Sequence, residues 1–170
     1  MRPETVGSIM LGAVLTLCAG GSPAAAADER DACSLLTQAR VSAVLGVSMG
    51  NGVYPGDGIP GDHPHDSREC VWPLAGQGSS SQTRVVLYLL GVVGTLTPTQ
   101  RFDRYAQQFA SMKTPVSGIG DDAFYVASPM NTSIYVRKGS SVFQVIVFGV
   151  PKEQIKSNEK TLAEEVVAKL

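Results

Sequence analysis

The sequence predicts an α+β domain: a single antiparallel β-sheet with two or three helices packed on one face, and one disulfide bond. Three observations lead to this class. Strand-like runs are joined by a tight hairpin turn, so these neighbouring strands must run antiparallel. The helical stretches carry apolar stripes that have to be buried against the sheet. Two cysteines remain once the N-terminal segment is set aside.

The length and charge of the chain indicate the number of domains and exclude one functional class. The chain has 170 residues, which suits one domain. Its 14 Lys and Arg nearly balance 15 Asp and Glu, and no run of like charge stands out. A general nucleic-acid binder carries a basic surplus, so the composition argues against that class.

The first 27 residues are expected to be a signal peptide. Residues 8–17 are almost wholly apolar and follow a short start that contains Arg2. Ala25 and Ala27 form the small-residue pattern that a signal peptidase recognises, so cleavage after Ala27 leaves residues 28–170 as a single exported domain. The apolar run is shorter than the roughly 20 residues of a membrane span, and no transmembrane segment is expected after cleavage. An uncleaved anchor is the alternative.

Cys18 lies in the same segment and raises the question of a lipid anchor. Lipidation normally requires a small residue immediately before the cysteine, and Leu17 occupies that position. A lipid anchor at Cys18 is therefore not expected, and the domain is predicted to be periplasmic or secreted.

The first element of the exported domain is predicted to be a short helix. Thr37 can cap its start, apolar residues follow at helical spacing, and Gly46 supplies a stop where a positive φ costs little. Residues 49–68 are rich in glycine and proline and are expected to form a loop. A short strand follows, in which Cys70 and Trp72 share one face.

A longer strand is predicted over residues 84–93, which are rich in Val, Leu and Tyr. The next helix has a strong start, because Thr97 can cap it, Pro98 suits its first position and Gln100 completes a capping box. One apolar stripe of this helix is expected in the core, and its members are Phe102, Tyr105, Ala106, Phe109 and Met112.

Three more strands and a last helix complete the chain. Strands are predicted over residues 123–126 and 133–137, and Gly139 with Ser140 makes a hairpin turn into a return strand over residues 141–150. The last helix begins at Pro151 and is expected to bury Leu162, Ala163, Val166, Val167 and Leu170.

Cys33 and Cys70 are expected to form the disulfide bond. They are the two cysteines of the exported domain, and an exported protein meets oxidising conditions. The alternative is a reactive thiol, but Arg30 is the only cation near Cys33 in the sequence, which gives a thiolate little local support. The bond would join the first helix to the strand of Trp72.

The candidate metal-binding segment is Asp62-His63-Pro64-His65-Asp66. Residues two apart in an extended backbone point the same way, and Pro64 favours extension at His63. Two imidazoles flanked by carboxylates are suited to Zn²⁺ or Cu²⁺, with His63, His65, Asp62 and Asp66 as the ligands. The alternative is a solvated polar loop with two chance histidines. No other cofactor is indicated.

A catalytic set is not evident, so an enzyme is not the expected class. Both histidines lie within residues 62–66, and any Ser-His or Cys-His mechanism would have to use them. Asp121 and Asp122 point to opposite faces if extended, which makes a poor acid–base pair. One of them is expected instead to bond nearby amides in a turn that contains Gly118 and Gly120.

Three basic residues of the predicted helix and the segment after it are a further, weaker candidate. Arg101, Arg104 and Lys113 are expected to be ordinary solvated charges. A weak anion-facing patch is the alternative.

Several short motifs resemble those of one known family. They are Asp-Ala-Cys-Ser-Leu-Leu-Thr at residues 31–37, Leu-Gly at 45–46, Cys-Val-Trp at 70–72, and Gly-Ile-Gly-Asp-Asp-Ala at 118–123. The pattern resembles small exported bacterial proteins, often lipoproteins, that form a domain of unknown function. The likeness spans nearly all of residues 31–150, although Arg40 stands where a Glu is usual. It implies an envelope location and a structural disulfide, and it implies no catalytic residue.

Together these features favour a non-catalytic module of the cell envelope or periplasm. It would bind a protein, a peptide or a small ligand through its sheet face or through residues 49–68. The expected partner is an envelope protein or a small ligand, not a nucleic acid. A periplasmic metal-binding protein that uses His63 and His65 is the first alternative, and a hydrolase with a cryptic site is the second.

Deletion of residues 1–27 tests the predicted signal peptide. The truncated protein should accumulate in the cytosol, because it lacks the apolar segment that the export machinery recognises. Fractionation of cells, followed by detection of the tagged protein, measures this distribution. Export of the truncated form would refute the assignment.

Overall fold

The computed structural model describes residues 30–55, 68–128 and 131–170. The predicted signal peptide, with Cys18, lies outside these residues. The predicted metal ligands Asp62, His63, His65 and Asp66 also lie outside them.

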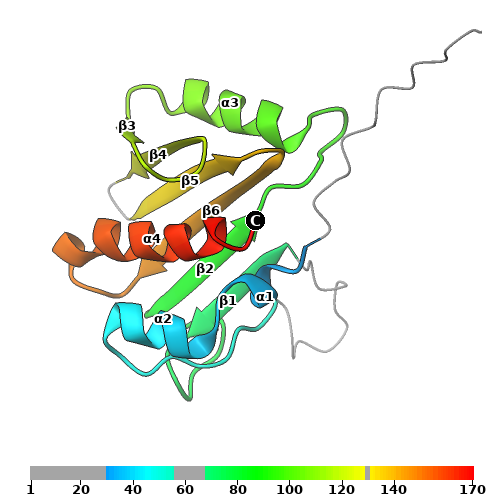
Figure 1. Cartoon of the computed structure of the whole chain (residues 1–170). Coiled ribbons are helices and arrows are strands. Elements are labelled where there is room, and N and C mark those ends of the chain that lie inside the picture. Colours follow the sequence, from blue (N-terminus) through cyan, green and yellow to red (C-terminus); the bar gives the residue numbers. More distant parts are fainter. Residues whose placement is uncertain (1–29, 56–67, 129–130) are drawn as a thin grey trace, which may run out of the picture.

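The described part of the chain forms one six-stranded sheet in which every neighbouring pair of strands is antiparallel. The strand order is β1-β2-β6-β5-β4-β3 (Figure 1). This confirms the predicted α+β class with a single antiparallel sheet. The strands are β1 (Glu69–Pro73), β2 (Arg84–Leu89), β3 (Lys113–Val116), β4 (Asp122–Ala127), β5 (Thr132–Lys138) and β6 (Ser141–Phe148).

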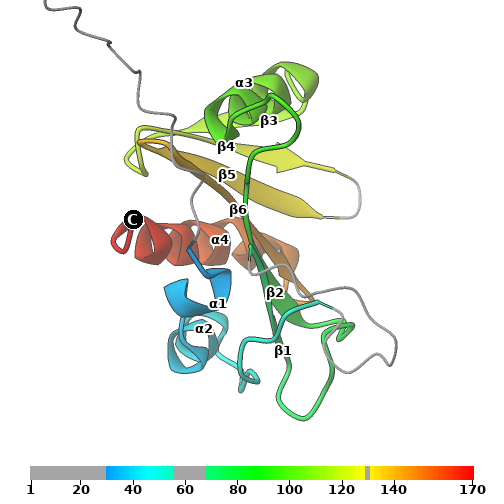
Figure 2. The same ribbon diagram turned by 90° about the vertical axis from the view of Figure 1, so that its right-hand side faces the viewer.

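Helices pack on both faces of this sheet. Three of them lie on one face, which we call the first face, and Figure 2 shows them together on the same side of β1 and β2. They are α1 (Ala32–Leu35), α2 (Gln38–Leu45) and α4 (Lys152–Val167). The helix α3 (Pro98–Gln108) packs on the opposite, second face. The expected layer of two or three helices on one face is therefore present, and α3 adds a second layer.

The first face is the main core because side chains alternate along each strand. The strand registers align five buried side chains in one row across the sheet. Burial of each aliphatic member of this row stabilises the fold by about 1.5–3 kcal/mol. The row runs Cys70, Leu87, Val145, Ile134 and Tyr125.

A smaller aromatic core fixes α3 on the second face. The ring of Phe102 lies 5.0 Å from that of Phe124, and Tyr135 lies 5.2 Å from Phe124 and 5.4 Å from Tyr105. Phe102 is buried in this cluster and Tyr105, Ala106 and Phe109 pack against it, which confirms that the apolar stripe of this helix is a core element. Met112 was wrongly placed in the stripe: its side chain is 42% exposed, because the helix ends at Gln108.

The predicted helix boundaries follow from local capping. Thr37 accepts a hydrogen bond from the backbone N–H of Arg40, and Gly46 ends α2 with a φ of 70°. At α3, the Thr97 side chain and the Gln100 side chain form the predicted reciprocal capping box, with Pro98 at the start. Both predictions are confirmed, because capping depends on residues only a few positions apart.

Two elements differ from the sequence prediction. The strand predicted over residues 84–93 ends at Leu89, and the chain then turns away toward α3. The strand β3 was not predicted, because Lys113 and Pro115 are both poor strand formers. It forms nevertheless because it pairs with β4 along its whole length, at the outer edge of the sheet.

The predicted disulfide between Cys33 and Cys70 is present and joins α1 to β1. The two Cα atoms lie 5.0 Å apart, within the range that a disulfide spans. Gly52 packs directly on this bond: a Cβ atom at that position would lie 2.7 Å from the sulfur of Cys70. The disulfide therefore joins two segments that are distant in the sequence, and a third segment, around Gly52, packs against it.

Replacement of both cysteines, C33A/C70A, tests how much the bond stabilises the fold. A loop closed over a separation of 37 residues is expected to contribute about 4 kcal/mol through the unfolded state. Urea unfolding should show a loss of this order in the free energy of unfolding. As a matched control, the reduced wild-type protein should unfold at the same urea concentration as the variant. Equal stability of the oxidised wild type and the variant would contradict the expectation.

Candidate functional site

The part of the second face that α3 does not cover carries a shallow groove of about 360 Å³. We call it the open-face groove. Its floor is formed by alternate residues of three adjacent strands, and its rim is formed by Pro55, Ser79 and Ser80. The floor residues are Glu69 and Val71 from β1, Arg84 and Val86 from β2, and Ile146 and Phe148 from β6.

The strand registers explain why these floor residues meet. Val71 lies opposite Val86, and Val86 lies opposite Ile146, so the three form one apolar row across the sheet. Arg84 lies opposite Phe148 in the neighbouring row. Residues i and i+2 of a strand point to the same face, so the two rows stand side by side in the groove.

Arg84 gives the groove a fixed positive charge. Its guanidinium carbon lies 4.0 Å above the centre of the Phe148 ring, and Nη1 donates a 2.6 Å hydrogen bond to the carbonyl oxygen of Ser81. Neither partner is an anion, and within the described chain no carboxylate pairs with Arg84. The side chain is therefore held in place, and no carboxylate of the described residues neutralises its charge, which suits it to bind a carboxylate.

The turn between β1 and β2 is internally bonded, which sets the rim of the groove. The hydroxyl of the buried Ser81 donates either to Oε1 of Gln77 at 2.7 Å or to the carbonyl oxygen of Thr83 at 2.8 Å. These bonds place Ser80 between the open-face groove and a second, polar hollow of about 460 Å³.

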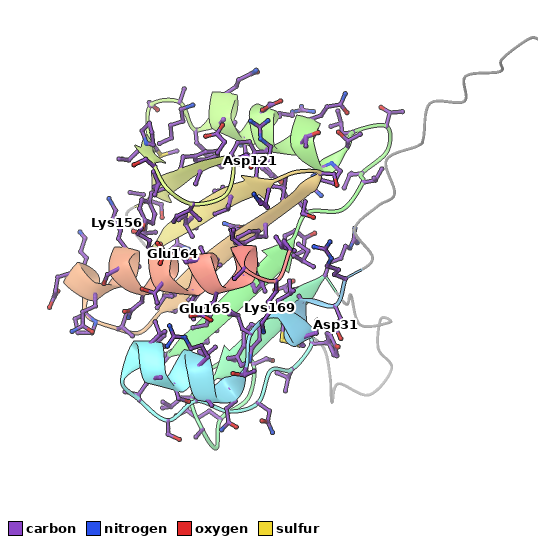
Figure 3. The ribbon with its side chains drawn as sticks, viewed as in Figure 1. Asp31, Asp121, Lys156, Glu164, Glu165 and Lys169 are labelled. Carbon is purple, nitrogen blue, oxygen red and sulfur yellow. A yellow bond between two sulfur atoms is a disulfide. The ribbon has the colours of Figure 1, made fainter. Side chains whose placement is uncertain are left out.

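The acidic turn predicted from the sequence is structural. The carboxylate of Asp121 (labelled in Figure 3) accepts a 2.6 Å hydrogen bond from the backbone N–H of Gly139 and lies 3.4 Å from Nζ of Lys138. The Gly139 amide, followed by the positive charge of Lys138, lowers the pKa of Asp121. Asp122 lies 3.5 Å from Arg137. The prediction that one of the two aspartates bonds a nearby amide is confirmed.

Glu165 of α4 contacts the helix beside it. The sequence suggests a pair with Lys169 one turn later, but Glu165 points toward α2 and binds Arg40, with Nη2 of Arg40 2.6 Å from Oε1 (Figure 3). Arg40 thus joins α2 to α4. Both side chains are partly solvated, so the pair contributes less than about 1 kcal/mol.

A buried carboxyl group on α4 was missed by the sequence analysis. Glu159 is 0% exposed and accepts a 3.3 Å hydrogen bond at Oε1 from the backbone N–H of Val147. Val147 lies just beyond the last residue of β6 that pairs with β5, so its N–H is available. Within the described chain, Oε2 has no hydrogen-bond partner. The available signal was its position three residues before Leu162, on the apolar stripe of the helix.

Burial raises the pKa of Glu159 to about 8, against smaller opposing effects of the Val147 N–H and the charge of Lys156. The ring of Tyr125 faces the same site from β4, and burial raises its pKa to about 12. Such shifts often mark catalytic groups, but a carboxyl that is closed off from solvent cannot reach a substrate. Glu159 therefore belongs to the packing of α4 against the sheet.

The predicted metal ligands cannot be placed, because residues 62–66 lie outside the described segments. Among the residues that the structure does describe, no three His, Cys, Asp or Glu side chains lie close enough to hold a metal ion. None of the described helices is both long enough and apolar enough to span a bilayer. Comparison with known proteins finds no matching family model, no matching curated protein and no matching solved structure.

The substitution E159Q tests the role of the buried carboxyl. The folded-state pKa is about 8 and the usual value is 4.5, so the folded protein holds this proton more tightly than the unfolded chain. The contribution of Glu159 to stability is therefore full below the lower value and is lost as the pH rises through the higher one. The wild type should lose up to ~1.4 kcal/mol per pH unit in this window, and E159Q should not.

Urea unfolding between about pH 5 and pH 8 measures both slopes. The matched control is E164Q, which makes the same change at an exposed position of α4. It should keep the wild-type slope, because it leaves the buried carboxyl group of Glu159 in place. Equal slopes for E159Q and the wild type would show that Glu159 is ionised in the folded protein.

Proposed function

We propose that this protein is an exported, non-catalytic binding module of the cell envelope, and that it holds an extended peptide segment of another envelope protein in the open-face groove. The observation that carries the proposal is the division of the second face. Aromatic side chains of α3 cover the sheet over β4 and β5, whereas β1, β2 and β6 present a groove to solvent.

Export is supported by the sequence of the first 27 residues and by the disulfide. A bond between Cys33 and Cys70 forms and persists in oxidising compartments such as the bacterial periplasm. The resemblance to small exported bacterial proteins supports the same location. These arguments are independent of the groove, since none of them uses its residues.

The chemistry of the groove favours a peptide that carries an apolar side chain close to a carboxylate. The row of Val71, Val86 and Ile146 offers an apolar floor, and beside it lies the positive charge of Arg84, which pairs with no carboxylate of the described segments. Hydroxyl groups of Ser79 and Ser80 at the rim can bond a peptide backbone. A volume of about 360 Å³ accommodates one or two side chains, which fits a short segment better than a large cofactor.

The alternatives rest on residues outside the described segments. A metal-binding protein requires His63 and His65, and a hydrolase that uses Ser79 or Ser80 requires one of the same histidines as its base. Both alternatives stay predictions, and no contact of the described residues favours either of them.

Site-specific photocrosslinking in the cells of the host tests the proposal. A photoreactive phenylalanine analogue at position 146 lies on the groove floor, and the same analogue at position 47 replaces an exposed valine outside the groove. A defined partner should be crosslinked from position 146 and not from position 47. Mass spectrometry of the crosslinked band identifies the peptide segment.

The variant R84Q tests the predicted carboxylate contact. Loss of a charge-assisted hydrogen bond of ~1.5–3 kcal/mol should reduce crosslinking from position 146 at least tenfold. The control K152Q removes the same charge at an exposed position of α4 and should have no effect. Crosslinking that is equal from positions 47 and 146, or absent from both, would refute the groove as a binding site.

A further inference from the structure

A second surface lies beside α3, away from the open-face groove. A groove of about 300 Å³ runs between this helix and the loop that precedes it, and exposed apolar side chains adjoin arginines there. We call it the α3 basic surface. The groove is lined by Val93, Leu96, Arg101, Arg104, Tyr105 and Gln108, and the surface also includes the exposed Val92, which precedes Val93 in the chain.

The apolar part of this surface is a tight turn with exposed valines. Val93 and Leu96 exchange two backbone hydrogen bonds of 3.1 and 3.0 Å, and Gly94 has the positive φ, 59°, that such a two-residue turn favours. Val92 is 42% exposed and Val93 is 55% exposed. Two exposed apolar side chains therefore lie at the start of this turn, Val93 within it and Val92 immediately before it.

The charged part of the surface is positive and consists of two arginines. Nη1 of Arg101 donates a 2.7 Å hydrogen bond to the carbonyl oxygen of Gly91, which fixes the guanidinium beside the turn. Within the described chain, neither Arg101 nor Arg104 pairs with a carboxylate. The nearest acidic residue in the sequence, Asp103, lies 3.6 Å from Arg137 of β5 instead.

We propose that the α3 basic surface binds the anionic phospholipid surface of a membrane. The two arginines contact headgroup phosphates, and Val92 and Val93 enter the interface beside them. This inference does not depend on the open-face groove or on its peptide, since the two surfaces share no residue.

The arrangement favours a lipid surface over an acidic peptide. Val92 and Val93 are 42% and 55% exposed just before the turn at Gly94, beside the two arginines, and a bilayer interface can receive exposed apolar side chains that adjoin positive charges. The net charge of the chain is −1, so attraction to an anionic membrane has to come from a local positive surface. Binding is expected to be reversible and to weaken with salt, because few residues contribute.

Vesicle sedimentation with residues 28–170 tests the proposal, since this part contains every described helix and strand. Binding is measured to vesicles of phosphatidylglycerol and phosphatidylcholine and to vesicles of phosphatidylcholine alone. The protein should bind the anionic vesicles and not the neutral ones. The variant R101Q/R104Q should bind roughly 30-fold more weakly, at about fivefold for each arginine near the surface.

Two further variants separate contact from folding. R104Q and V93S alter side chains at the surface without removing the Arg101–Gly91 bond, and each should weaken binding while thermal unfolding stays unchanged. The matched control K152Q/K169Q removes two exposed positive charges from the α4 side and should bind as the wild type does. Equal binding to both vesicle types, equal loss in the control, or binding only to a soluble polyglutamate peptide would overturn the proposal.

Discussion

The bond between Cys33 and Cys70 is the constraint on which both the core and the open-face groove depend. β1 is the first strand of the sheet, and within the described chain only β2 and the short stretch around Val53 pair with it. The disulfide ties this strand to α1, and Gly52 packs on the bond from the other side. Because Glu69 and Val71 of β1 form part of the groove floor, the same bond that holds the first helix also holds the binding surface.

The two faces of the sheet have different roles: the first face holds the main core, and the second face carries the open-face groove. On the first face, α1, α2 and α4 bury a continuous row of side chains, and this face supplies most of the stability. On the second face, the α3 core covers β4, β5 and the start of β6, and the groove occupies parts of β1 and β2 with the end of β6. The position of α3 thus sets which part of the second face is core and which part a ligand can contact.

Much of the fold was predictable because its signals are local. Thr97, Pro98 and Gln100 mark the start of α3 within four residues, and Gly46 marks the end of α2. The side of the sheet on which α3 packs was not predictable, since it depends on whether Phe124 or Tyr125 faces the helix. That choice is made by the register of β4 with β5, which no local pattern specifies.

The candidate site was less accessible from the sequence than the fold. Val71, Val86 and Ile146 look like ordinary strand residues, and only their long-range registers bring them together. Glu159 had a signal in its position on the apolar stripe of α4, but a glutamate is normally assigned to the solvent side of a helix. Arg84 likewise became informative only when its neighbours Phe148 and Ser81 were known.

The two edge strands of the sheet affect whether copies of this protein can pair through their backbones. At one edge, β3 is four residues long and contains Lys113 and Pro115, which lacks the N–H that a further strand would need. At the other edge, Val53 and Gly50 already bond the backbone of β1. In the described part of the chain, neither edge therefore offers a long free ladder, and this disfavours polymerisation through the strands.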